Sequence, residues 1–313
     1  MGNCLITKLK GVVTNDELLK LGEIKVKFGS NQGKPFRTIF EGDITIKALT
    51  GSLTDSTGMT SLSEAKGSAS EIYVKENTIV SISSKYNLTS FNIYNNRSDG
   101  KENDVTFDFD LLKYTALGPI EISGGEKVTG DVSIMNDKNS GYVVLSNMKN
   151  VYGTINYDGK SMNLSTLRVS KVPNVCIDID GLSGASALNS ISVEANSKGS
   201  INSLPASITQ ISLYGANKIT GDLSLMNNNL HSVYAGTLTW KNERNNTYPI
   251  ISLQYINLGE DCDRMLINQA KCPASTKAPE KNIIIFGTRT SASDNAISTL
   301  QEKGYTVSIG SAL

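Results

Sequence analysis

The chain has 313 residues, of which 39% are hydrophobic and 19% are charged. This composition supplies enough apolar side chains to bury a core, which excludes a wholly disordered protein. The 30 basic and 30 acidic residues balance. No global field therefore gathers nucleic acid or an anionic membrane, and we expect neither as a partner.

The start of the chain shows no targeting segment. Its first residues include Lys8, Lys10 and Asp16 and form no long apolar run, so no signal peptide is predicted. No segment of the chain approaches the roughly 20 apolar residues of a membrane-spanning helix. These features predict a protein that is made in a cytoplasm and not exported by a cleaved leader.

Residues 1–115 are expected to form a β-rich N-terminal region. A stretch rich in Gly, Ser and Thr at 50–70 predicts a loop, and the polar run at 95–104 predicts an exposed insertion. The last predicted strand carries Phe91 and Ile93 and can already belong to the repeat that follows. The strands expected in this region are Ile24–Phe28, Ile44–Ala48, Ile72–Lys75, Ile79–Ser83 and Phe91–Tyr94.

An internal repeat marks residues 116–258. The heptad TGDVSIM that begins at Thr129 returns as TGDLSLM at Thr220, 91 residues later, which corresponds to four units of about 23 residues. Related segments begin at Val151, Val175 and Lys198. A short strand with an apolar pair at positions i and i+2 precedes each segment. These apolar positions are Ile120/Ile122, Val143/Leu145, Leu167/Val169, Ile191/Val193, Ile211/Leu213 and Val233.

A unit of this length with one short strand cannot bury its apolar side alone, so neighbouring units must stack. We therefore expect a leucine-rich-repeat-like β-solenoid in which the apolar pairs point inward and the residue between them faces solvent or a partner. Asp131 and Asp222 hold equivalent positions and are expected to accept hydrogen bonds from turn amides. The alternative is a chance pattern within an ordinary β-sandwich.

Residues 259–313 are expected to form a strand–helix–strand capping unit, which makes the whole chain α+β and mostly β. Pro273 ends a first predicted helix, and a second helix has Ile297 and Leu300 facing inward and Gly304 as its stop. Such a unit covers the open core and prevents end-to-end stacking. The predicted segments are a helix at Asp261–Lys271, strands at Ile283–Phe286 and Tyr305–Ile309, and an N-cap at Ser291–Asp294.

The four cysteines are expected to be reduced thiols. Cys4, Cys176, Cys262 and Cys272 contain no C-x-x-C pair, and one histidine, His231, accompanies them, so a zinc site is not predicted. Cys262 and Cys272 lie at opposite ends of the predicted helix, where ten residues span ~15 Å. That distance exceeds the reach of a disulfide.

Catalytic chemistry has few candidates. His231 precedes a predicted strand without a nucleophile motif beside it, which favours a turn residue. Two pairs, Asp108/Asp110 and Asp178/Asp180, have the spacing to share one face of a strand. Such pairs can serve a glycan-cleaving enzyme or bind calcium, but like charges on a solvent face are common. We expect no enzyme, no metal and no cofactor.

Aromatic residues suggest a contact surface instead. Tyr214 and Tyr234 lie near strands 20 residues apart, so they can stack as neighbours on the exposed side of the sheet. Trp240, the sole tryptophan, ends a repeat strand and is either a core residue or a third member of this surface. Tyr142 and Tyr152 are further exposed candidates.

The central units resemble degenerate bacterial leucine-rich repeats, with Val or Ile where that consensus has Leu. The opening MGNCLITKLKG, the segment GTRTSASD from Gly287 and the segment GYTVSI from Gly304 are similar to small proteins of gut Bacteroidales and their crAss-like phages. This resemblance implies a virion accessory protein, such as a head fibre, a tail appendage or a decoration protein. It carries over no functional residues.

These patterns together predict a non-catalytic structural or attachment protein of a phage virion that presents a repeat surface for contact. We expect a homo-oligomer that meets other virion proteins through its N-terminal region. The alternative is a module that binds a bacterial surface glycan or protein and resides in the bacterial cytoplasm or at the cell surface. A glycan-cleaving β-solenoid enzyme is the third hypothesis.

Overall fold

The computed structural model describes residues 23–55, 61–66, 71–83, 87–95, 101–214, 218–244, 249–274 and 281–311. The protein is mostly β, with 44% strand and 16% helix, and the described strands form two large sheets and no closed barrel. The predicted mostly β character is confirmed. Residue contacts divide the chain into two compact units, residues 1–153 and 154–313. The three regions expected from the sequence, with limits at 115 and 258, remain a prediction.

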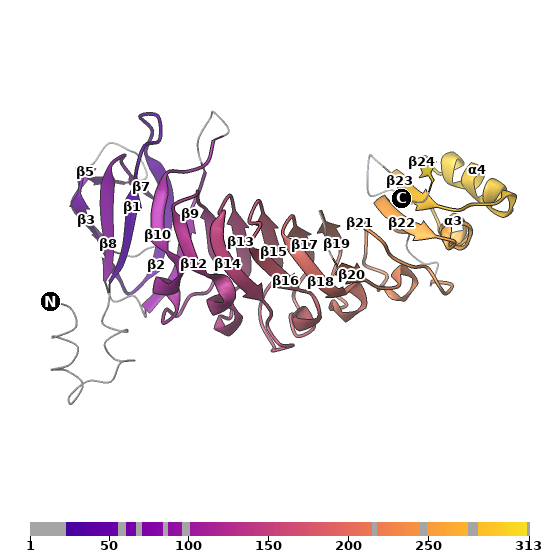
Figure 1. Cartoon of the computed structure of the whole chain (residues 1–313), viewed down its shortest axis with the longest axis horizontal. Coiled ribbons are helices and arrows are strands. Elements are labelled where there is room, and N and C mark those ends of the chain that lie inside the picture. The colour runs from indigo at the N-terminus through magenta and orange to yellow at the C-terminus, as the bar shows by residue number, and fades with distance from the viewer. Residues whose placement is uncertain are drawn as a thin grey trace. The chain divides into compact units, whose positions relative to one another are not determined.

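The first unit begins with antiparallel strands (Figure 1). β8 pairs with both β1 and β3, and β2 lies between β7 and β9. On β1 the residues Ile24, Val26 and Phe28 are fully buried while Lys25 and Lys27 are exposed, as the alternation of side chains requires. The strands here are β1 (Ile24–Phe28), β2 (Phe36–Gly42), β3 (Thr45–Thr50), β4 (Leu53–Thr54), β5 (Ser61–Leu62), β6 (Glu64–Lys66), β7 (Ile72–Val74) and β8 (Thr78–Ser83).

Pairing becomes parallel further along the same unit. Ile120 lies opposite Phe91 on one side and Val143 on the other, so the strand that carries Phe91 pairs in parallel with the first strand of the predicted repeat. In the second sheet β12 pairs in parallel with β10 and β14. The elements are β9 (Leu88–Ile93), β10 (Val105–Asp108), η2 (Phe109–Leu112), β11 (Ile120–Ser123), β12 (Val128–Asp131), η3 (Val132–Asp137), β13 (Tyr142–Ser146) and β14 (Asn150–Ile155).

Two predicted loops differ from the structure. The segment 50–70 contains three short strands, β4, β5 and β6, so it was wrong to expect a loop throughout. In the segment 95–104, Asn103 is buried because its side-chain amide donates to the carbonyl oxygens of Tyr94 and Ser123. These backbone partners satisfy the side-chain nitrogen of Asn103 in the interior, and composition alone does not reveal them.

The second unit contributes seven parallel strands to the longer sheet, in the order β15, β17, β19, β21, β22, β23 and β24, and we call this part the long sheet of the second unit. Ile191 lies opposite Leu167 and Ile211, and all three are fully buried, as the predicted inward apolar pairs require. The strands are β15 (Thr166–Ser170), β17 (Ser190–Val193), β19 (Gln210–Leu213), β21 (Ser232–Tyr234), β22 (Ser252–Gly259), β23 (Lys281–Gly287) and β24 (Tyr305–Gly310).

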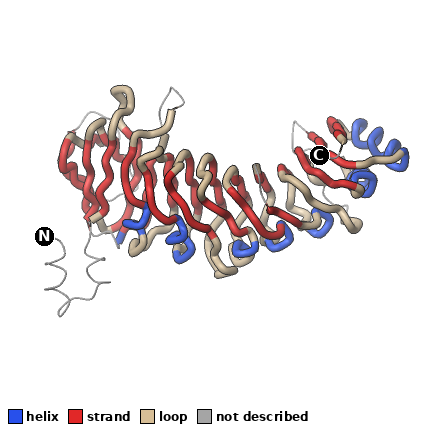
Figure 2. The backbone as a smooth tube through the Cα atoms, in the orientation of Figure 1, coloured by secondary structure: helices blue, strands red, loops and turns tan. Residues whose placement is uncertain are grey.

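A shorter parallel sheet and a series of one-turn 3₁₀ helices accompany the long sheet. Figure 2 shows several of these turns as short blue segments. Asp222 explains why an aspartate follows the glycine of the repeated heptad: its carboxylate accepts from the Ser224 amide at 2.9 Å and caps the turn. The elements are β16 (Val175–Asp178), η4 (Asp180–Leu182), β18 (Asn196–Ser200), η5 (Ile201–Ser203), β20 (Lys218–Thr220) and η6 (Leu223–Leu225).

The same capping contact occurs in the first unit, where Asp131 accepts from the Ser133 amide at 2.8 Å. The predicted role of both aspartates is therefore confirmed. The glycine of the heptad has a different reason. Gly221 has a φ of 137°, and a Cβ there would lie 2.4 Å from Cγ1 of Ile201. Any larger residue would need an unfavourable backbone conformation and would collide with the preceding turn.

The C-terminal elements follow the predicted order of helix, strand, helix and strand. Helix α3 (Cys262–Lys271) ends before Pro273, and a 3₁₀ turn, η7 (Ser291–Ser293), precedes helix α4 (Asp294–Glu302). Cys176, Cys262 and Cys272 are free thiols, while Cys4 lies outside the described residues. Within the described residues, no helix is both long and apolar enough to cross a bilayer.

Among the described residues, these elements leave one strand edge of the sheet unpaired. β22, β23 and β24 continue the sheet in parallel, and β24 is its outermost strand. Val307 and Ile309 on β24 are half-buried, whereas Ile283 on β23 is fully buried. The two helices were predicted correctly. Which strand forms the open edge of the sheet depends on long-range pairing, which the local pattern does not encode.

Candidate binding surface

The long sheet of the second unit has two faces, because successive side chains of a strand point to opposite sides. On β19 and just after it, Ile211 and Leu213 are buried, and Gln210 and Tyr214 on the other side are exposed. We call this second side the outer face. From β19 to β24 its described strand residues include no charged one. These residues are Gln210, Ser212, Tyr214, Ser232, Tyr234, Ser252, Gln254, Tyr255, Asn257, Asn282, Ile284, Phe286, Thr306, Ser308 and Gly310.

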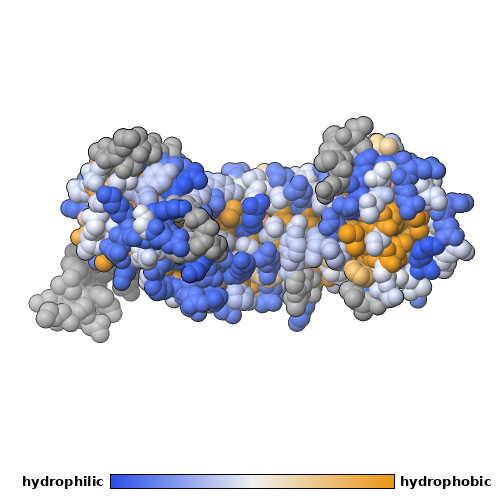
Figure 3. All heavy atoms as spheres, turned by 90° about the horizontal axis from the view of Figure 1, so that it is seen from above, coloured by the Kyte–Doolittle hydropathy of each residue, from blue (hydrophilic) through white to orange (hydrophobic). Residues whose placement is uncertain are grey.

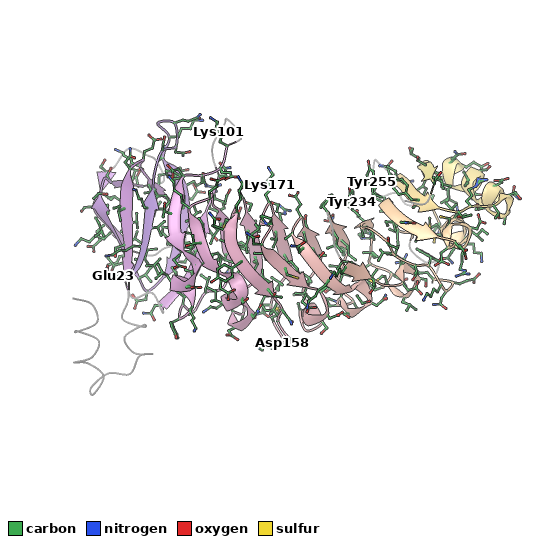
Figure 4. The ribbon with its side chains drawn as sticks, in the orientation of Figure 1. Glu23, Lys101, Asp158, Lys171, Tyr234 and Tyr255 are labelled. Atoms are coloured by element: carbon green, nitrogen blue, oxygen red, sulfur yellow. The ribbon has the colours of Figure 1, made fainter. Side chains whose placement is uncertain are left out.

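Four aromatic rings form a continuous row across the outer face, and we call this row the aromatic ladder. The ring centroids of Tyr214 and Tyr234 are 4.2 Å apart, those of Tyr234 and Tyr255 are 5.1 Å apart, and those of Tyr255 and Phe286 are 6.5 Å apart. The rings are tilted by 34° to 43°, and Figure 4 shows Tyr234 and Tyr255 next to each other. Such tilted, offset pairs add stability beyond their buried area.

Tyr255 is in a strained conformation. Its φ is +57°, and the register between β22 and β23 shifts between Gln254 and Ile256. This bulge leaves both Gln254 and Tyr255 on the accessible side of the strand. A bulge redirects a side chain, and a left-handed conformation costs a non-glycine residue about 1–2 kcal/mol. The bulge therefore places the Tyr255 ring in the row, at the cost of this strained backbone conformation.

Phe286 ends the ladder above a glycine. Phe286 lies opposite Gly310 on β24, and a Cβ added at Gly310 would lie 2.6 Å from Cδ1 of the Phe286 ring. The missing side chain thus leaves room for the ring to lie over the last strand. Asn257 is the partner of Phe286 on β22, so the ring has an amide side chain on one side and open backbone on the other.

The tyrosine hydroxyls of the ladder stay uncharged, as Tyr234 illustrates. Burial raises the pKa of Tyr234, and the neighbouring hydroxyls of Tyr214 and Tyr255 raise it further. The Tyr234 hydroxyl therefore stays protonated at physiological pH and can both donate and accept a hydrogen bond. The charged side chains on this side lie earlier in the unit, where Arg168 on β15 and Glu194 after β17 are exposed.

The sequence identified half of this row. Tyr214 and Tyr234 were expected to stack, and they do so. Tyr255 and Phe286 were missed. Strict alternation after Leu253 and Gln254 would have turned Tyr255 inward, and only the bulge brings it to the outer face. Phe286 ends an apolar run that indicates a core strand. The recurrence of an aromatic residue about 20–30 positions after Tyr214 and after Tyr234 was the available signal.

Trp240 is not a member of the surface, so its assignment as a contact residue was wrong. It is fully buried, its backbone amide donates to Asp261 at 2.9 Å, and its carbonyl accepts from Arg264. The indole packs in the interior next to the start of α3. The sequence predicted that Trp240 ends a repeat strand, but in the structure Trp240 lies outside the strands, after β21.

The acidic pairs do not share a strand face. Asp108 ends β10 and Asp110 lies in η2, while Asp178 ends β16 and Asp180 lies in η4. Their carboxylates serve the fold: Asp108 accepts from the Asp110 amide, and Asp110 accepts from the Asp131 amide.

In the second unit, Asp178 is paired with Lys198 at 3.1 Å. Asp180 accepts from the Ser203 hydroxyl at 2.6 Å and from the Ser200 amide, and these bonds lower the pKa of its carboxyl. Across the described residues, no three His, Cys, Asp or Glu side chains are placed to hold a metal ion. The half-buried His231 lies just before β21.

The first unit also carries tyrosines with a different arrangement. Tyr142 is half-buried, and its hydroxyl accepts from the Asn92 amide at 3.1 Å. Tyr152 on β14 is 53% exposed. Arg37 lies 4.4 Å from the ring centroid of Tyr94 and pairs with Glu71. This cluster contains opposite charges that are already satisfied by each other, unlike the uncharged outer face of the second unit.

No protein-family model matches the chain, and comparisons with curated proteins and with solved structures found no match either. The candidate surface is therefore defined by the geometry and chemistry of this chain alone.

Proposed function

We propose that the protein is a non-catalytic attachment protein, built as a leucine-rich-repeat-like β-solenoid, that binds a neutral bacterial surface glycan through its outer face. The frame of the proposal is the series of parallel strand pairs, in which Ile191 stacks on Ile211 and Ile211 on Val233. In a solenoid, each repeat buries its apolar side against its neighbours and leaves the opposite face free for contact.

The observation that carries the binding proposal is the aromatic ladder on an uncharged face. Sugar hydroxyls donate and accept hydrogen bonds, as do the Ser, Thr, Asn and Gln side chains of the outer face. The apolar faces and edges of sugar rings can pack on the exposed sides of aromatic rings. Tyr214 is 36% exposed and Tyr255 is 48% exposed. The strand residues of this face from β19 to β24 offer no ion pair to an acidic polymer, but their hydroxyl and amide groups suit a neutral one.

Pre-organisation favours this surface. Each ring of the ladder is held by its neighbours, and strands fix the backbone, so little rotamer freedom remains to be lost on binding. Tyr and Ser are also the residues that antibody paratopes use for rigid, amphipathic contact area. A protein ligand would use the same chemistry, and it is the alternative outcome of the test below.

The test is binding of the full chain to an array of bacterial surface polysaccharides. We expect binding to neutral polysaccharides and at least a tenfold loss of affinity for Tyr234→Ala, equivalent to about 1.4 kcal/mol. Tyr152→Ala is the matched control, because it removes an exposed tyrosine in the first unit and should change nothing. Binding only to proteins, or equal affinity of the two variants, would overturn the glycan proposal.

The proposed setting is a phage particle, where the protein would be a head fibre, tail appendage or decoration protein. This setting rests on the resemblance proposed from the sequence segments MGNCLITKLKG, GTRTSASD and GYTVSI to proteins of gut Bacteroidales and their crAss-like phages. Its test is mass spectrometry of purified particles from a phage that encodes the chain. Absence of the chain from the particles would remove the virion proposal and leave the binding proposal to its own test.

A further inference from the structure

The edge of the long sheet at β24 lacks the features that usually protect a sheet edge. Natural edge strands carry charges, prolines or bulges, or are very short, because a bare edge pairs readily with another chain. β24 spans six residues, Tyr305–Gly310, with no charged residue and no proline. It pairs with β23 over six consecutive positions without a register shift. Within the described residues, no strand pairs with its other edge.

Apolar side chains beside this edge are only half covered. Figure 3 shows hydrophobic residues gathered over the C-terminal elements. Val307 and Ile309 on β24 and Ile297 on α4 are half-buried. They line an open groove of about 350 Å³ together with Gly287, Arg289 and Gly310. On the neighbouring strand β23, Ile283 and Ile285 are 0% and 1% exposed, which shows the burial that one further strand provides.

We propose that β24 is a homodimer interface, in which a second copy of this chain adds its own β24 in antiparallel orientation. The sequence of the strand is self-complementary when Val307 lies on the two-fold axis. Tyr305 then lies opposite Ile309 of the other copy, and Val307 lies opposite itself, so the inward positions match apolar with apolar. Thr306 lies opposite Ser308, so the outward positions match hydroxyl with hydroxyl.

The charges around the groove allow this approach. β24 itself is neutral, and Arg289, at the rim of the groove, is paired with Asp294 of its own chain. A second copy therefore brings no like charge against the strand. A two-fold antiparallel arrangement is isologous and closes after two copies, whereas head-to-tail addition would continue into a filament. The edge is therefore expected to bind one further copy and no more. This inference does not depend on the proposed glycan binding.

A cross-linking experiment tests the register directly. In an antiparallel pair, directly opposite Cα atoms are about 4.5–5.5 Å apart, which suits a disulfide. Val307→Cys in the full chain should therefore form a covalent dimer under mild oxidation. Ile309→Cys should not, because residue 309 lies opposite residue 305. Equal cross-linking of the two variants, or none in either, would overturn the proposed pairing.

A charge experiment tests the interface without removing apolar contacts. The outward double variant Thr306→Lys/Ser308→Lys places like charges opposite each other across the two-fold axis, as does Thr306→Glu/Ser308→Glu. Light scattering should show a dimer for the unmodified chain and a monomer for each variant alone. Mixing the two variants should restore a dimer. A monomeric unmodified chain, or dimers that persist in both variants, would contradict the proposal.

Discussion

Asp222 offers the sharpest test of how the turns of the second unit are held. Its carboxylate accepts from the Ser224 amide at 2.9 Å, from the Ser224 hydroxyl at 2.6 Å, from the Lys241 amide at 3.1 Å and from the Asn242 side chain at 3.2 Å. The residue is 6% exposed. Replacing it by alanine removes all four acceptor contacts at once.

The expected cost follows from which donors lose their partner. Ser224 is buried, so its amide finds no water in place of Asp222, and an unsatisfied buried donor costs about 1–3 kcal/mol. Lys241 is exposed, so its amide can bind water instead. The Ser224 hydroxyl loses its acceptor in the same variant, which adds about 1 kcal/mol. We therefore expect Asp222→Ala to lower the free energy of unfolding by about 3 kcal/mol.

Asp222→Asn should cost much less. The amide oxygen can still accept from Ser224 and Lys241, and only the contact with Asn242 is lost, at about 1 kcal/mol. Asn202 shows that a side-chain amide oxygen can serve as an acceptor here, since it accepts from the Asp222 amide at 2.8 Å. The exposed Asp180 is a second comparison, since water can replace it as the acceptor for Ser200 and Ser203.

The assay is equilibrium urea unfolding followed by tryptophan fluorescence. Trp240 is the sole tryptophan, is fully buried and lies in the same unit, so its emission reports on the structure around Asp222. If Asp222→Ala were no more destabilising than Asp180→Ala, or than Asp222→Asn, the argument from buried donors would be refuted.

Three further predictions concern other contacts. Gly221→Ala should destabilise the second unit by about 2–4 kcal/mol because its Cβ would collide with Ile201. Gly259 is the control: it also has a positive φ, but no atom lies within 4 Å of a Cβ there, so Gly259→Ala should cost only about 1 kcal/mol. Similar unfolding midpoints for the two variants would contradict this reasoning. Burial alone would raise the pKa of Asp263, but hydrogen bonds from the α4 start lower it below its usual value. Ionised Asp263 therefore stabilises the fold fully above its unfolded pKa, and this contribution is lost as the pH falls through its folded pKa. In Asp263→Asn, the melting temperature should depend less on pH across that acid range than in the unmodified chain. Lys138, which is 8% exposed, donates to two carbonyls of the preceding turn, so Lys138→Met should cost about 1–3 kcal/mol and speed hydrogen exchange around that turn.

The sequence by itself determined the local pattern of the repeat. The i, i+2 apolar pairs had to share one side of a strand, because side chains alternate, and residues such as Ile191 and Val193 are indeed fully buried. The heptad placed Asp131 and Asp222 where a turn begins. Their capping role could be predicted because each carboxylate accepts from the amide only two residues later. The helix between Cys262 and Cys272 kept these thiols apart because helical rise is fixed. The neighbouring position of Tyr214 and Tyr234 followed from the spacing of their strands.

Tertiary structure decided the features that depend on pairing between distant segments. A register shift placed Tyr255 on the outer face, and no local pattern encodes that shift. Trp240 is buried where its backbone bonds to Asp261 and Arg264 at the start of α3. The edge of β24 is bare because of its position at the end of the sheet order. Burial and edges are properties of how strands meet, so residues with the same local pattern can end in the core, on a binding face or at an interface.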